Sequence, residues 1–109
     1  MLDTTPLITA VDRFADRLRS TPQSRLQQGV AAEALATARE LSTRAQRAEE
    51  RGREPRTMPD VGIFAVGDQL AVAGRDLAVA LETASSQELD EAVRRVEEAA
   101  ARAFAPGRR

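Results

Sequence analysis

The stretch VGDQLAVAGRDLAVAL, from Val66 to Leu81, decides the fold, because it is apolar on almost every side of a helix. Its clearly polar residues are Asp68, Gln69, Arg75 and Asp76. The main apolar face extends beyond the stretch at both ends and comprises Ile63, Val66, Leu70, Ala73, Leu77, Ala80, Leu81 and Ala84. A helix that is apolar on most sides has to be covered by several neighbours. We therefore expect it to be used on two sides, as the central element of a helical bundle.

A narrow apolar seam follows the opposite side of the same helix. Ala65, Val72 and Val79 lie between two polar rows, one with Asp68, Arg75 and Glu82 and the other with Gln69, Asp76 and Thr83. An apolar seam flanked by charges is typical of a coiled-coil-like contact. We expect self-association here, most simply as a homodimer, through Ala65, Asp68, Val72, Arg75, Val79 and Glu82. Two alternatives remain: the N-terminal helix covers this side, or Val72 and Val79 are isolated surface residues.

Gly67 and Gly74 lie seven residues apart, at the edge of the main apolar face. A glycine inside a helix costs about 1 kcal/mol relative to alanine. Close approach of a neighbouring helix is the usual compensation. We therefore expect close helix packing at both glycines, most simply against the alanine-rich face of residues 23–51 or of residues 86–105.

Periodicity and end signals predict four helices. The signals include Pro6 in a first turn and a capping box formed by Ser85 and Glu88, and no strand-like alternation occurs. The predicted helices cover about 5–19, 23–51, 61–84 and 86–105, with a linker over 53–60 and a disordered tail over 106–109. The fold class is therefore an all-α, single-domain bundle of one short and three longer helices, completed by dimerisation.

The linker REPRTMPD, Arg53 to Asp60, contains two prolines, which prevent the preceding helix from continuing. Asp60 can cap the helix that follows it. Pro59 and Phe64 can then form a hydrophobic staple across that cap.

Composition predicts a thin core. The chain has 109 residues, of which 42% are hydrophobic, and alanine is the commonest of these. Its aromatic residues are Phe14, Phe64 and Phe104. Alanine removes little area from water, at roughly 25 cal/mol per Å². A second chain can supply the missing burial, and a twofold dimer is the commonest such closure.

Catalysis is not expected. The chain has no histidine and no cysteine, so it has no ordinary general base near neutral pH and no thiol nucleophile. The usual zinc sites draw on those same two residues. The glycines do not form a phosphate-binding loop. We therefore expect a non-enzymatic protein without cofactor or metal, which takes part in protein–protein interaction or regulation.

Nucleic-acid binding is the alternative function. Its candidate contacts cluster at the end of the helix over 23–51 and in the linker: Arg44, Arg47, Arg51, Arg53 and Arg56. Interspersed glutamates reduce the local charge, and no aromatic residues interleave for base stacking. The net charge of −1 gives no global attraction to nucleic acid or membrane. Because no signal-peptide pattern or membrane-length apolar run occurs, we expect a cytoplasmic protein.

Overall fold

The computed structural model describes residues 1–106, and within that range it contains helices and no strand. The predicted all-α bundle is confirmed. The elements in chain order are α1 (Thr5–Arg19), α2 (Gln23–Arg25), a π-helical turn η1 (Leu26–Val30), α3 (Ala31–Glu49), α4 (Val66–Leu81) and α5 (Ser86–Ala103). Of the tail predicted over 106–109, residues 107–109 lie outside the described part of the chain.

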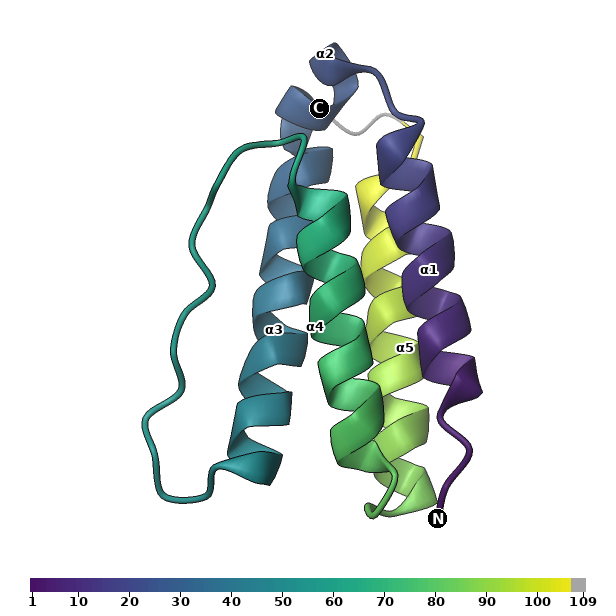
Figure 1. The fold of residues 1–109 in the computed structure, drawn as a ribbon. Helices are drawn as coiled ribbons and strands as arrows, with labels where there is room; N and C mark the ends of the chain where they lie inside the picture. The colour runs from purple at the N-terminus through teal and green to yellow at the C-terminus, as the bar shows by residue number, and fades with distance from the viewer. Residues whose placement is uncertain (107–109) are drawn as a thin grey trace.

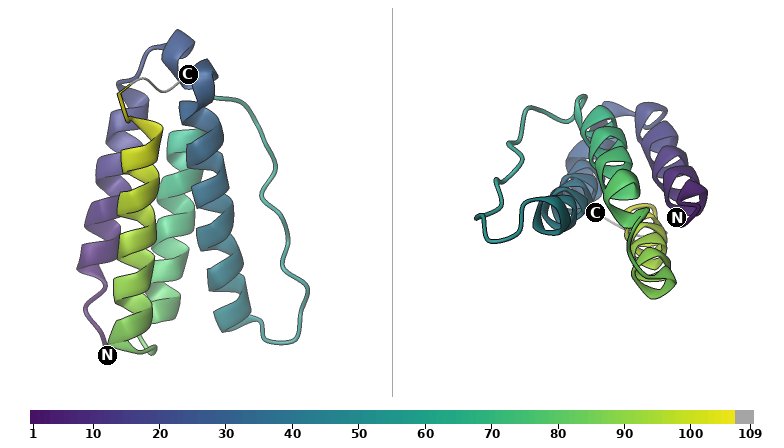
Figure 2. Two further views of the ribbon diagram at one scale, coloured as in Figure 1. Left: turned by 180° about the vertical axis from the view of Figure 1, so that it is seen from behind. Right: turned by 60° about the horizontal axis from the view of Figure 1, so that its bottom comes forward.

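The four long helices form a bundle with one long crossover (Figure 1). As drawn, α1 and α5 run upward, whereas α3 and α4 run downward. Residues 50–65 return along the outside of the bundle, so α3 and α4 are parallel neighbours. Seen obliquely from below, the helices stand at the corners of a square, with α4 and α5 at opposite corners (Figure 2). The helix α4 therefore packs against both α3 and α1.

The helix predicted over 23–51 is interrupted near its start. Gln28 leaves helical geometry, and Gly29 has a φ of +109°, in the left-handed region that favours glycine. Continuous helix geometry resumes at Ala31. The prediction of one unbroken helix was wrong because the apolar period of 3.6 continues across the break, so periodicity alone does not detect it.

The helix predicted over 61–84 is shorter than expected, since α4 covers only Val66–Leu81. Gly62 has a φ of +107°, and its N–H donates to the Asp60 side chain at 2.9 Å. Asp60 therefore closes a turn before the helix instead of capping it. The predicted Pro59–Phe64 staple is also wrong, because the Phe64 side chain is 74% exposed.

The start of α5 is confirmed by its capping box. The Ser85 hydroxyl accepts from the Glu88 N–H at 3.2 Å, and the Glu88 carboxylate accepts from the Ser85 N–H at 3.3 Å. This box fixes where the chain turns out of α4 into α5. The turn is short, so these two helices are antiparallel.

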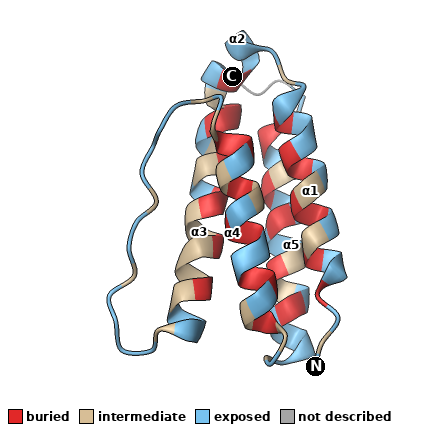
Figure 3. Cartoon of the chain, viewed as in Figure 1, coloured by how far each residue is buried: buried red, intermediate tan, exposed pale blue. Residues whose placement is uncertain are grey.

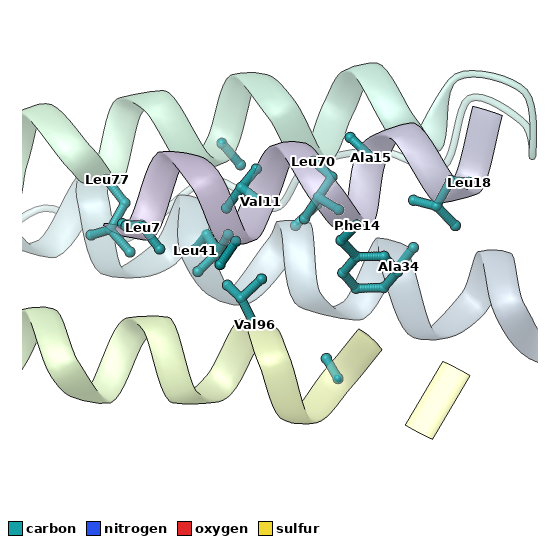
Figure 4. Close-up of a cluster of buried hydrophobic side chains, with 14 of the residues drawn as sticks. Leu7, Val11, Phe14, Ala15, Leu18, Ala34, Leu41, Leu70, Leu77 and Val96 are labelled. Atoms are coloured by element: carbon teal, nitrogen blue, oxygen red, sulfur yellow. The ribbon is translucent and has the colours of Figure 1, made fainter. Parts of the chain in front are cut away.

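The core lies inside the square, where the buried faces of all four helices meet (Figure 3). Large side chains fill its centre (Figure 4), and the largest fully buried ones are Phe14, Leu7, Leu41, Leu70, Leu77, Val11, Val30 and Val96. Alanines on each helix let the backbones approach one another. None of the helices in residues 1–106 is long and apolar enough to cross a membrane.

Candidate functional site

Large exposed apolar side chains concentrate on α4 and the turn before it. Apart from Met1, the exposed large hydrophobic residues of the described chain are Val61, Phe64, Val72 and Val79. The valines on α4 are 58% and 61% exposed, and Phe64 is 74% exposed. Single exposed apolar residues are normal on a protein surface, whereas several that gather in one region are typical of a contact surface. We call these four residues the α4 surface.

The middle of the predicted seam is open, but its ends are not. Val72 and Val79 point to solvent from the outer side of α4. Ala65 stands at the N-cap of α4, and Glu82 stands at its C-cap, where the backbone carbonyl of Glu82 accepts from the Leu2 N–H at 2.9 Å. Both residues are only half exposed. The freely accessible part of the seam is therefore centred on the two valines.

One edge of the seam is held by ion pairs to α1. The Arg19 guanidinium donates to the Asp68 carboxylate at 2.8 Å, and Arg75 donates to Asp12 at 3.2 Å. The hydrogen bond with Asp68 raises the pKa of Arg19 above its ordinary value. Two of the residues predicted for self-association, Asp68 and Arg75, thus bind their own chain. The N-terminal helix covers part of the second side of α4, which is one of the two alternatives left open by the sequence.

The other edge is formed by the crossover segment. Gln69 donates its side-chain amide to the Pro59 carbonyl at 2.8 Å. Farther back along the segment, Arg39 on α3 donates to the Met58 carbonyl at 2.8 Å. These bonds hold the segment against α3 and α4, so the exposed valines lie on a face with two fixed edges.

Gly67 and Gly74 approach α1. Neither of the two segments expected from the sequence, residues 23–51 and residues 86–105, is the neighbour at these glycines. A Cβ atom at Gly67 would lie 3.4 Å from the carbonyl oxygen of Ala15, and one at Gly74 would lie 2.6 Å from Cγ1 of Val11. The expected packing against residues 23–51 or 86–105 was therefore wrong. Periodicity placed both glycines on one edge of the helix, but the identity of the neighbour at that edge depends on the topology of the bundle.

The five arginines proposed for nucleic acid divide into two groups. Three of them bind carboxylates of this chain: Arg44 lies 3.0 Å from both Glu40 and Glu91, and Arg53 and Arg56 both pair with Glu50. The hydrogen bond from Arg44 lowers the pKa of Glu91 below its ordinary value.

Arg47 and Arg51 form the second group of these arginines. They are exposed and pair with no carboxylate in residues 1–106. Two unpaired arginines are fewer than a phosphate-binding surface usually presents.

The described residues do not provide a metal-binding cluster. No group of three or more acidic, histidine or cysteine side chains there could hold a metal ion. Comparison with protein-family models, curated protein sequences and solved structures gives no significant match to this chain.

Proposed function

We propose that this chain is a non-enzymatic helical protein that binds a second copy of itself through the α4 surface. The observation that carries the proposal is the confinement of the exposed large apolar residues to positions 61–79, with Met1 as the exception among the described residues. The absence of histidine and cysteine from the sequence supports a role in binding over a role in catalysis.

Charge placement favours a parallel pair of α4 helices. At about 100° per residue, Arg75 and Asp76 lie on opposite sides of the line that joins Val72 to Val79. When two α4 helices run parallel about a twofold axis, each valine meets its own copy, and Arg75 faces Asp76 of the second copy. An antiparallel pair would instead set Arg75 against Arg75. Arg75 is 59% exposed and can reach an additional acceptor while its contact with Asp12 persists.

The size of the surface predicts a weak dimer. Stable interfaces bury about 1,200–2,000 Å² in total, which two valines from each chain do not provide. Val61 and Phe64, which precede α4 in the chain, are also exposed, and we expect the contact to reach them. We therefore expect a dimer whose population rises with protein concentration, and not an obligate assembly.

The Val72→Asp substitution is expected to weaken self-association at least about tenfold, because it places a carboxylate opposite its own copy at the centre of the contact. Light scattering on a sizing column, over a range of concentrations, measures the effect. Ala101→Asp is the matched control, since Ala101 is exposed on α5, at the corner opposite α4. Equal masses for Val72→Asp and the unchanged chain would contradict the assignment to α4.

A charge exchange tests the parallel arrangement separately. Arg75→Asp alone and Asp76→Arg alone each create like charges across the axis, so each is expected to weaken self-association. An equimolar mixture of the two variants restores both opposite pairs and is expected to recover the dimer. If both single variants dimerise like the unchanged chain while Val72→Asp does not, the parallel arrangement is wrong and self-association through α4 stands.

A further inference from the structure

A second surface lies at the end of the bundle where α3 and α4 finish and α5 starts. An open cleft of about 780 Å³ lies there between these three helices. Leu77 and Leu81 line it from α4, and Ala84 lines it from the turn after that helix. Arg47 and Arg51 line it from the end of α3 and the residues just after that helix. Its volume lies within the range of about 300–1,000 Å³ that is common for small-molecule sites. Neither Val72 nor Val79 lines the cleft, so it is separate from the α4 surface.

The cleft exists because the side chains around it are short. The lining includes Ala48 from α3, Ala80 from α4, Ala84 from the turn after α4, and Ala92 from α5. Methyl groups do not bridge the space that separates the ends of three helices, and protein interiors usually fill such spaces. Leu77 and Leu81 also line the cleft, but they are only 2% and 7% exposed. The accessible apolar lining therefore comes mainly from Ala48, Ala80 and Ala84, which are exposed or half-buried.

The rim carries positive charge that the described residues neutralise only in part. Arg44 and Arg47 lie one turn apart on α3, Arg51 lies in the turn that follows the helix, and all three line the cleft. Arg44 is bound to Glu40 and Glu91, whereas Arg47 and Arg51 have no carboxylate partner in the described part of the chain. The carboxylate among the lining residues belongs to Glu88, which accepts from the Ser85 N–H.

We propose that this cleft binds a medium-chain aliphatic carboxylate. The hydrocarbon chain lies over Ala80, Ala84 and the accessible edges of Leu77 and Leu81, and the carboxylate accepts from the guanidinium groups of Arg47 and Arg51. Guanidinium groups match carboxylates in paired geometry. The complementarity is therefore apolar at the floor and electrostatic at the rim.

The local charge favours a monoanion over a polyanion. The carboxyl ends of α3 and α4 both lie at this end of the bundle, and helix carboxyl ends carry partial negative charge. Together with Glu88, they offset part of the positive charge of the arginines. A single carboxylate suits this balance better than a phosphate dianion or a nucleic-acid backbone does.

The experiment is a titration of the full chain with decanoate, followed by backbone amide NMR below the concentration at which decanoate forms micelles. We expect saturable shifts centred on Leu77, Leu81 and Ala84. Acetate, which has only the head group, and decylammonium, which has the opposite charge, are expected to bind at least about tenfold more weakly. No saturable shift with decanoate, or equal affinity for decylammonium, would overturn the proposal.

Two double variants test whether Arg47 and Arg51 bind the carboxylate. Arg47→Ala with Arg51→Ala is expected to weaken decanoate binding at least about tenfold. Arg13→Ala with Arg94→Ala removes the same charge from exposed positions outside the cleft and is expected to leave binding unchanged. Equal affinity in the two double variants would overturn the role of the rim.

Ala48→Leu leaves every charge in place and fills the cleft, so it is expected to reduce binding by a similar factor. Because Ala48 is exposed, this variant is expected to fold. Undiminished decanoate binding by Ala48→Leu would place the ligand elsewhere and overturn the proposal.

Discussion

Replacing Phe14 with alanine is expected to lower the free energy of unfolding by about 3–5 kcal/mol, the usual cost of deleting a buried aromatic ring. Phe14 on α1 is 2% exposed and lies in the interior of the bundle (Figure 4). Its ring meets that of Phe104 edge to face, with the ring centroids 6.1 Å apart and an interplanar angle of 73°. The core around this aromatic pair consists of aliphatic side chains and many alanines, so removal of the ring leaves a cavity.

Denaturant unfolding followed by circular dichroism measures this loss. Phe64→Ala is the matched control, because it removes the same side chain from a position that is 74% exposed. We expect it to change stability by less than about 0.5 kcal/mol and, because Phe64 belongs to the α4 surface, to weaken self-association. Equal destabilisation by the two substitutions would contradict the placement of Phe14 in the core and of Phe64 on the surface.

Gly74→Ala is expected to destabilise the protein by about 2 kcal/mol, even though alanine is the better helix former by about 1 kcal/mol. The added Cβ would lie 2.6 and 2.7 Å from the two γ-carbons of Val11 and 3.0 Å from its Cβ. Val11 is buried and β-branched, so its side chain has no free rotamer into which it can move. The two helices have to separate instead.

Gly67→Ala provides the control on the same helix. Its added Cβ would lie 3.4 Å from both the Ala15 carbonyl oxygen and Cγ of Arg19, which is close to ordinary contact. We expect this variant to be neutral or more stable by up to about 1 kcal/mol. Adding Val11→Ala to Gly74→Ala is expected to recover part of the loss, as a double-mutant cycle would measure. Additive effects of those two substitutions would contradict the close approach of α1 and α4.

Most of the helices could be predicted from local signals in the sequence. The apolar period identified four helices, and the serine and glutamate at positions 85 and 88 identified the start of α5 within one residue. These features depend on residues close together along the chain. The break at Gly29 and the late start of α4 at Val66 escaped, because both depend on local φ values that apolar periodicity does not report.

Long-range features were harder to predict. The glycines of α4 were recognised as a close-packing edge, but α1 occupies that edge because residues 50–65 cross over and make α3 parallel to α4. Val72 and Val79 are exposed, as both the seam and the alternative of isolated surface residues require. The pairing of Asp68 and Arg75 with α1 depends on the assembled bundle and could not be predicted from the sequence. The cleft was not predicted, because it arises where small side chains from three separate helices leave the space between them unfilled.

The central claim is that α4 binds a second copy of this chain, and solution mass measured against concentration tests it most directly. The chain has a mass of 11.8 kDa. The account predicts that light scattering finds a mass rising toward twice that value as concentration increases, with Val72→Asp remaining near the mass of one chain. A mass that stays at 11.8 kDa at every concentration, with and without the substitution, would contradict it.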